Sequence, residues 1–163
     1  MKRLIAFALL VLALFTCVSC ANTDNPEVDV RLGFSKYMIT IPERYETKDF
    51  ELAENQIAYY SKDENSVDFD IYQWKKDGLY TLAEEAAFQA QKHDQTPSDV
   101  TFNGINCKKF ISFERYGGKD YIIANYMFED ETYFTKLSFW TVGTDAEFDF
   151  ADKIAGTLKI MGE

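Results

Sequence analysis

Three turn signals between residues 100 and 142 constrain this fold more than any other feature of the sequence. Asn103-Gly104 favours a type I′ turn, because Asn and Gly tolerate the positive φ angles that both central positions need. Gly117-Gly118 and the acidic run at residues 129–131 supply two further turns. The segments between these turns are rich in β-branched and aromatic residues. The sequence therefore predicts an antiparallel meander.

One segment of this meander, residues 121–128 (YIIANYMF), is apolar at nearly every position rather than at every second one. Such a pattern is typical of a strand with both faces covered. Further strands are expected earlier in the chain, at residues 34–41, 56–61 and 67–74.

Two helices complete the expected fold. Thr81 and Glu84 form a capping box, and a stripe of small and apolar side chains follows at Leu82, Ala86 and Ala90. A second capping box, Thr144 with Glu147, begins a helix that buries apolar side chains at Phe150, Ile154 and Leu158. The predicted class is α+β, with helices on both faces of an antiparallel sheet.

The first twenty residues have the order of a secretory signal: Lys2 and Arg3, a short apolar run, and small residues before Cys20. The apolar run is shorter than the roughly 20 residues that span a bilayer. The segment resembles a bacterial lipoprotein signal, which implies a lipid, palmitate included, on Cys20. Cys17 stands where that signal usually has leucine, so Cys17 is the alternative acylation site.

The sequence predicts three parts: a signal peptide at residues 1–19, a lipidated N-terminus and flexible tether at residues 20–31, and a single domain at residues 32–163. The tether is expected because residues 21–29 have no apolar period and include Pro26. The lipid would anchor the domain outside the bacterial cytoplasmic membrane, facing away from anionic lipid because the chain is acidic.

The formal charge is −10, from 17 basic and 27 acidic residues. This balance argues against nucleic-acid binding, which depends on clustered Lys and Arg. A single histidine and three cysteines leave little material for a transition-metal site, and neither a nucleotide-binding nor a hydrolase motif is present. We expect no cofactor, no metal and no identifiable catalytic residue.

The strongest candidate for a binding surface is an alternating strip on the strand at residues 67–74. Strand periodicity places four side chains on one face, Asp68, Asp70, Tyr72 and Trp74. Carboxylates beside aromatic rings can hold a sugar or a cationic ligand. A plain structural face, with the two aromatic side chains beneath a helix, is the interpretation that the sequence favours.

The two aspartates also have the spacing of a glycosidase pair. A general acid, however, needs a raised pKa, and on an open strand face water would keep both carboxylates ionised. Catalysis by this pair is therefore the weaker alternative.

Two isolated residues could carry chemistry. Cys107 lies on the same strand face as Ile105 and Ile111, which predicts a buried apolar thiol rather than a nucleophile activated by His93. We expect His93, close to the end of the first helix, to be solvated.

Three segments carry a resemblance to a known fold. They are Gly33-Phe34 leading into residues 39–42 (ITIP), residues 102–105 (FNGI), and residues 157–160 (TLKI) after the last helix. Over residues 33–160 the sequence resembles the fold shared by the photosystem II protein PsbP, a nuclear Ran-GTPase release factor and many small bacterial lipoproteins. Functions within this group differ, so the resemblance implies a fold and not an activity.

The sequence therefore predicts a lipid-anchored binding or assembly domain of the bacterial envelope. Its expected partners are the membrane, through the lipid, and an envelope protein or extracellular ligand. The alternative function is a carboxylate-dependent, glycan-active enzyme.

Overall fold

The computed structural model describes residues 26–48, 54–61, 67–142 and 148–162. In chain order its elements are β1 (Glu27–Arg31), β2 (Tyr37–Pro42), β3 (Glu46–Thr47), β4 (Gln56–Ser61), β5 (Asp68–Lys75), α2 (Leu82–Gln91), β6 (Ser98–Phe102), β7 (Ile105–Tyr116), β8 (Lys119–Glu129), β9 (Tyr133–Val142), α3 (Phe148–Ala155) and β10 (Lys159–Ile160).

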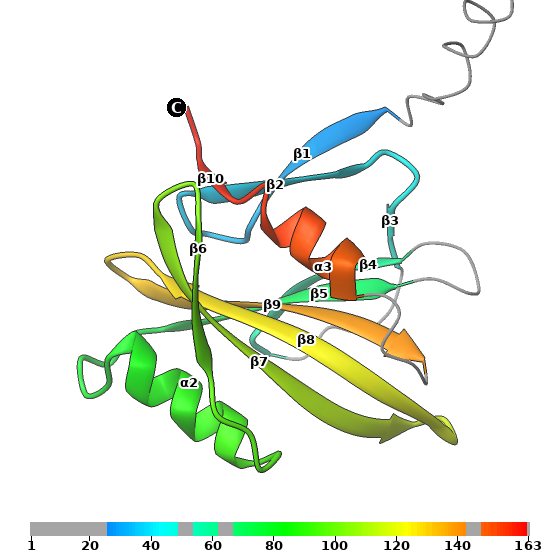
Figure 1. Ribbon diagram of the computed structural model, residues 1–163. Coiled ribbons are helices and arrows are strands. Elements are labelled where there is room, and N and C mark those ends of the chain that lie inside the picture. The colour runs from blue at the N-terminus through cyan, green and yellow to red at the C-terminus, as the bar shows by residue number, and fades with distance from the viewer. Residues whose placement is uncertain (1–25, 49–53, 62–66, 143–147, 163) are drawn as a thin grey trace, which may run out of the picture.

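A twisted seven-stranded sheet dominates the molecule (Figure 1). Its strand order is β3-β4-β5-β9-β8-β7-β6, and every neighbouring pair is antiparallel. The predicted meander is confirmed by β6 to β9. Asn103 and Gly104 have φ angles of 48° and 80°, and Gly117 and Gly118 have 57° and 80°, so the residue types match the turns that they form.

Strand β8 is covered on both faces, as its apolar run predicts. Tyr126 and Phe128 belong to the main core on one face, whereas Met127 belongs to a second core on the other. All three side chains are at most 1% exposed. The sheet therefore separates two apolar layers.

Helix α2 covers part of one face. The predicted capping box is present: the Glu84 amide donates to the Thr81 hydroxyl and the Thr81 amide donates to the Glu84 carboxylate. Ala86 and Ala90 are fully buried, and their small side chains bring the helix close to β7 and β8. The helix packs against sheet residues of the second core, Phe110, Met127 and Phe134.

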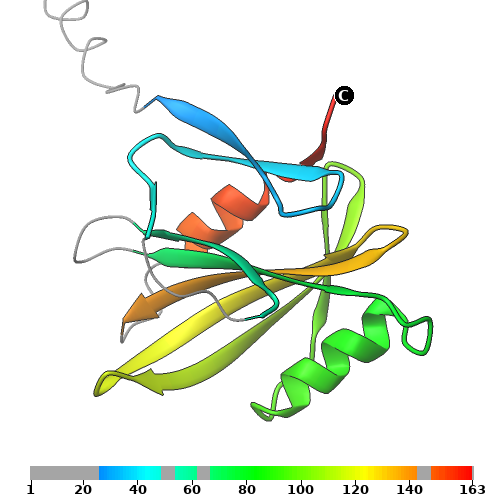
Figure 2. The same ribbon diagram turned by 180° about the vertical axis from the view of Figure 1, so that it is seen from behind.

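The opposite face carries α3 and a second sheet of order β1-β2-β10 (Figures 1 and 2). The short helix contributes Ala151 and Ile154 to the main core, between the two sheets. The α+β class and the antiparallel sheet are thus confirmed. The expected sandwich with helices on both faces of the sheet is not confirmed, because a second sheet lies beside the short helix α3 on this face. That sheet is hard to anticipate because β10 has only two residues. Thr144 and Glu147 lie outside the described residues.

The small sheet also corrects the expected boundary between tether and domain. Residues 27–31, which we expected in the tether, pair along their whole length with β2. Asp29 fixes the strand further, because its carboxylate accepts from the Thr40 hydroxyl at 2.7 Å and pairs with Lys159 at 2.9 Å. The sequence predicts a tether because residues 21–29 have no apolar period and include Pro26, whereas backbone pairing with β2 holds residues 27–31 in the domain.

The strand expected at residues 34–41 begins later, at Tyr37, because a turn precedes it. Gly33 has a φ angle of 57°, and a side chain there would meet Ile57 and Gln73. The Gln73 side chain occupies this space and accepts from the Phe34 amide at 2.9 Å. Gly33 therefore allows β5 and the small sheet to approach closely.

Candidate functional site

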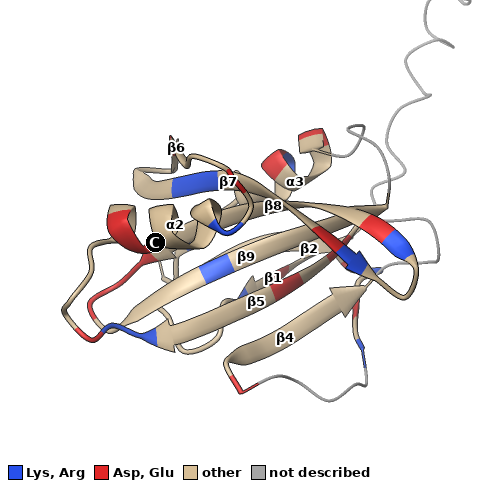
Figure 3. Cartoon of the chain, turned by 90° about the horizontal axis from the view of Figure 1, so that it is seen from below, with Lys and Arg blue, Asp and Glu red and all other residues tan. Residues whose placement is uncertain are grey.

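The alternating strip on β5 has the geometry that its sequence predicts. Val67, Phe69 and Ile71 point into the main core and are at most 2% exposed. Asp68, Asp70, Tyr72 and Trp74 occupy the other face, which is the face that α2 partly covers (Figure 3).

The strand register brings partners from other strands onto this face. Asp70 lies opposite Ser138 on β9, and Ser138 lies opposite Asn125 on β8. In the next row, Tyr72 lies opposite Lys136. Directly paired residues in a sheet have Cβ atoms about 4.5–5.5 Å apart, so these rows bring the polar side chains into reach of one another.

A cavity of about 250 Å³ lies over these rows and beside the C-terminal part of α2. Its wall is made mostly of polar and aromatic side chains, from α2, from the turn that follows it and from strands β4, β5, β7, β8 and β9: Gln56, Asp70, Tyr72, Gln89, His93, Phe110, Ser112, Glu114, Ile123, Asn125, Lys136, Ser138 and Trp140. The sequence did not predict a cleft on this strand face, and in the structure the cavity lies between the sheet and the end of α2, where Gln89 borders it.

The cavity divides the four predicted residues. Asp70 and Tyr72 line it, whereas Asp68 and Trp74 do not. Asp68 accepts a hydrogen bond from the Tyr59 hydroxyl and pairs with Lys48 at 3.2 Å. Trp74 packs on Phe134 in the core beneath α2, with ring centroids 5.9 Å apart, as the structural interpretation predicts. The two aspartates therefore do not act as a pair in one cavity.

Asp70 is a buried carboxylate, with 6% of its surface exposed. Its Oδ2 atom accepts from the Trp140 indole at 3.0 Å and from the Gln56 amide at 3.2 Å. Burial raises the pKa of Asp70 to about 6, although the charge of Lys136 and the hydrogen bond from Trp140 oppose that rise. The expectation that this carboxylate lies on an open, solvated strand face is therefore wrong.

Lys136 is the residue of the site that sequence reasoning missed. Its ammonium lies 5.3 Å from the centre of the Tyr72 ring. Within the described parts of the chain it makes neither a hydrogen bond nor an ion pair. Burial lowers the pKa of Lys136, and Asp70 partly opposes this. The available signal was a single charged residue in the otherwise uncharged strand β9.

A hydrogen-bonded group of side chains forms the floor of the cavity. The Asn125 amide nitrogen donates to the Ser112 hydroxyl at 2.9 Å, and its oxygen accepts from the Ser138 hydroxyl at 2.9 Å. All three side chains are at most 3% exposed. Because each rotamer is held by its neighbour, the floor is preorganised.

His93 and Cys107 lie on opposite sides of the sheet. His93 is half-buried and lines the cavity, whereas we expected it to be solvated. Cys107 is 1% exposed in the main core, as predicted, and burial raises its pKa to about 12. The arrangement excludes a Cys–His catalytic pair.

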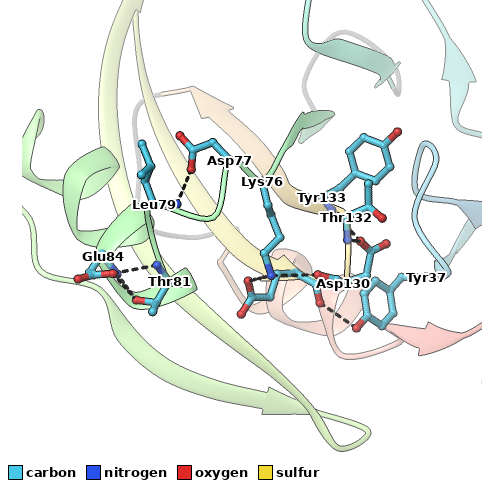
Figure 4. Close-up of polar contacts among 10 residues, drawn as sticks. Tyr37, Lys76, Asp77, Leu79, Thr81, Glu84, Asp130, Thr132 and Tyr133 are labelled. Atoms are coloured by element: carbon cyan, nitrogen blue, oxygen red, sulfur yellow. Dashed lines mark hydrogen bonds and ion pairs between the residues drawn. The ribbon is translucent and has the colours of Figure 1, made fainter.

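A second polar group fixes the segment that leads from β5 into α2 (Figure 4). Lys76 pairs with Glu129 at 2.6 Å and donates to the Asp130 carbonyl at 3.1 Å. Asp130 in turn accepts from the amides of Thr132 and Tyr133 in the β8–β9 turn. These contacts hold Lys76, the first residue after β5, against the β8–β9 turn.

Three further predictions concern lipidation, metal binding and a membrane span. Cys20 and Cys17 lie outside the described residues. In the described ranges, no three side chains of the metal-ligating types cluster together. None of the helices in these ranges has the length and apolarity to cross a membrane.

No protein-family model and no curated protein sequence matches the chain. Among solved structures, PsbP (CyanoP) of the cyanobacterium Synechocystis is similar with a TM-score of 0.50 and 10% identity, over 87% of this chain and 97% of that one. LpqN of Mycobacterium tuberculosis, which is involved in cell envelope biogenesis, has a TM-score of 0.56 and 13% identity, over 83% and 90% of the two chains.

The Ran-binding protein Mog1p of Saccharomyces cerevisiae has a TM-score of 0.52 and 10% identity, over 84% of this chain and 96% of that one. A protein of Bacteroides thetaiotaomicron has a TM-score of 0.56 and 17% identity over 78% of this chain, which spans only 46% of that protein's length. At these identities the similarity concerns the fold alone. The chain therefore has the PsbP/Mog1-like fold that its sequence resembles.

Proposed function

We propose that this chain is a lipid-anchored protein of the bacterial envelope whose domain binds a small polar ligand in the cavity over β5, β9 and β8. The observation that carries the proposal is the presence of Asp70 and Lys136 on one cavity wall. In the described part of the chain, Lys136 forms no ion pair with Asp70. Burying charged groups without direct pairing costs free energy, and such groups concentrate at functional sites.

The shape of the site supports binding. Small-molecule sites are concave, with a few placed polar groups among apolar and aromatic side chains. Here the floor of Ser112, Asn125 and Ser138 is held by its own hydrogen bonds, and Tyr72 and Trp140 supply aromatic rings. A preorganised site loses little conformational entropy when a ligand binds.

A matched pair of substitutions on α2 tests this function. Gln89 lines the cavity, whereas Gln91, on the same helix, is exposed and does not line it. We expect sugars, sugar acids or organic acids to raise the thermal unfolding midpoint of the full chain in mild detergent. Gln89→Trp should abolish that rise because it fills the cavity, and Gln91→Trp should retain it. Equal stabilisation of both variants would contradict the proposal.

The proposed location at the envelope is supported by the N-terminal sequence, in which a short apolar run is followed by small residues and Cys20. The similarity to LpqN, a protein involved in cell envelope biogenesis, fits an envelope role. Cells supplied with a clickable palmitate analogue should label the wild-type chain and the Cys17→Ser variant, but not the Cys20→Ser variant. Label retained by Cys20→Ser and lost by Cys17→Ser would move the anchor to Cys17.

One observation favours a second function, the hydrolysis of a glycan. A general acid needs a pKa well above that of a solvated carboxyl, and burial in the cavity raises the pKa of Asp70 to about 6. Glu114 at the same cavity would be the second carboxylate, since Asp68 is engaged by Lys48 and Tyr59. Reducing-sugar release from a glycan panel should then be lost in Asp70→Asn. Release that persists in this variant would exclude Asp70 as the acid.

A further inference from the structure

The cavity wall presents hydrogen-bond donors that the protein itself does not use. Within the described residues, the Lys136 ammonium and the His93 ring make no side-chain hydrogen bond. The Ser112 hydroxyl accepts from Asn125, and its own hydrogen has no acceptor in the same part of the chain. Donors shielded from bulk water need acceptors, so this wall favours a ligand that supplies acceptor atoms.

Lys136 sets the charge of that ligand. The ammonium lies over the Tyr72 ring at 5.3 Å, in the row between Tyr72 and Met127. A carboxylate is the natural partner of a partly buried ammonium without an ion pair, because a charge-assisted hydrogen bond offsets its desolvation. The cation also argues against the cationic ligand that the β5 carboxylates alone would allow.

The other side chains of the cavity wall indicate which chemical group carries the carboxylate of the ligand. Asp70 and Glu114 bring negative charge to the cavity, which disfavours a ligand with two negative charges and favours hydroxyl groups that donate to carboxylates. Gln56 and Asn125 add amide groups, and Tyr72 and Trp140 add ring faces. A volume of about 250 Å³ limits the ligand to roughly the size of one sugar ring.

Resting on the proposed binding function, we propose that the ligand is a sugar acid with a single carboxylate, which pairs with Lys136 while hydroxyl groups of the ring donate to Asp70 and Glu114. The site would distinguish such an acid from the corresponding neutral sugar by the Lys136 contact. The site would distinguish a sugar acid from a short carboxylic acid by its contacts to the sugar ring.

Matched ligands test the proposal on the unmodified chain. Calorimetric titrations at pH 7.5 would compare glucuronate with glucuronamide, which replaces the carboxylate by a neutral amide, and with glucose and propionate. We expect glucuronate to bind about tenfold or more tightly than the other three, as one charge-assisted hydrogen bond predicts. Equal binding of glucuronate and glucuronamide would overturn the inference while leaving the binding function intact.

Substitutions then assign the preference to one side chain. Lys136→Gln should make the affinities for glucuronate and glucuronamide equal, and Lys136→Arg should keep part of the preference because it retains the charge. Lys153→Gln is the control, since Lys153 is exposed on α3, on the other side of the sheet. A preference for glucuronate that survives in folded Lys136→Gln would overturn the assignment. Binding of none of the four ligands would overturn the sugar-acid proposal, and the cavity-filling pair on α2 would still test the binding function.

Discussion

The hydroxyl of Tyr126 on β8 donates to the carboxylate of Asp152 on α3 across a distance of 2.6 Å. The tyrosine is 1% exposed, and burial followed by the Asp152 contact raises its pKa, so the hydroxyl stays a donor. Lys109 on β7 pairs with the same carboxylate at 2.7 Å. A short helix of eight residues is thereby held against the sheet by polar contacts in addition to its apolar face.

Replacing this tyrosine by phenylalanine should lower the free energy of unfolding by about 1–2 kcal/mol. The ring and its packing remain, but a hydrogen bond to a charged group is lost, and the carboxylate keeps Lys109 and some solvent. Urea unfolding followed by circular dichroism measures the change. Tyr116→Phe, at a side chain that is 75% exposed, is the control and should leave stability unchanged. Equal stability of the two variants would mean that the Tyr126 hydroxyl contributes nothing to the attachment of α3.

Asp70 should make the domain less stable as the pH rises. Its pKa is raised by burial from an ordinary 3.8 to about 6, so the folded protein holds this proton more tightly than the unfolded chain. The contribution to stability is therefore present below about pH 4, falls between pH 4 and 6, and is absent above that range. The full difference is of the order of 3 kcal/mol.

The Asp70→Asn variant removes this titration and keeps an oxygen that can accept from Trp140. Its stability relative to wild type should therefore increase between pH 4.5 and pH 7, as measured by urea unfolding at both values. Asp94→Asn is the control, at an exposed position with a φ angle of 55° that asparagine tolerates. If the free energy of unfolding changes with pH in the same way in both variants, burial of the Asp70 carboxylate does not cause the pH dependence of stability.

Local signals in the sequence were sufficient for the meander but not for the cavity. Asn103-Gly104 sets the turn from β6 to β7, and the apolar run in β8 indicates two covered faces, because both effects act within a few residues. The cavity depends instead on which residues of separate strands face one another. Asp70, Ser138 and Asn125 meet only through the pairing of β5, β9 and β8.

Lys136 shows most clearly which features of the site could not be predicted from the sequence. Lys136, Ser138 and Trp140 stand at every second position of β9, so the sequence predicts that they share one face. The burial of Lys136, however, depends on α2 and β5. The edge strand β1 was missed for a similar reason, since its pairing with β2 is a contact between segments and not a property of either one. Tertiary pairing thus decides both the boundary of the domain and the chemistry of its site.

The close approach at Gly33 predicts a steric effect that can be separated from backbone strain. Gly33 and Gly117 have the same φ angle of 57°, but a Cβ atom at Gly33 would lie 2.8 Å from the Gln73 side-chain oxygen, whereas one at Gly117 would meet nothing within 4 Å. Gly117→Ala should cost about 1 kcal/mol from its left-handed backbone alone. Gly33→Ala should cost about 1–3 kcal/mol more. Equal midpoints of urea unfolding would show that Gln73 and Ile57 move aside without cost.

The thiol of Cys107 should resist alkylation in the folded protein. It is 1% exposed, and burial raises its pKa from 9.0 to about 12, which lowers the thiolate fraction at neutral pH roughly a thousandfold. Iodoacetamide at pH 7.5 should therefore leave the peptide that contains Cys107 unmodified in native buffer and modify it fully in denaturing urea, as peptide mass spectrometry would detect. Rapid modification in native buffer would mean that β7 opens to solvent, and it would contradict a main core that is closed beneath α3 and the small sheet.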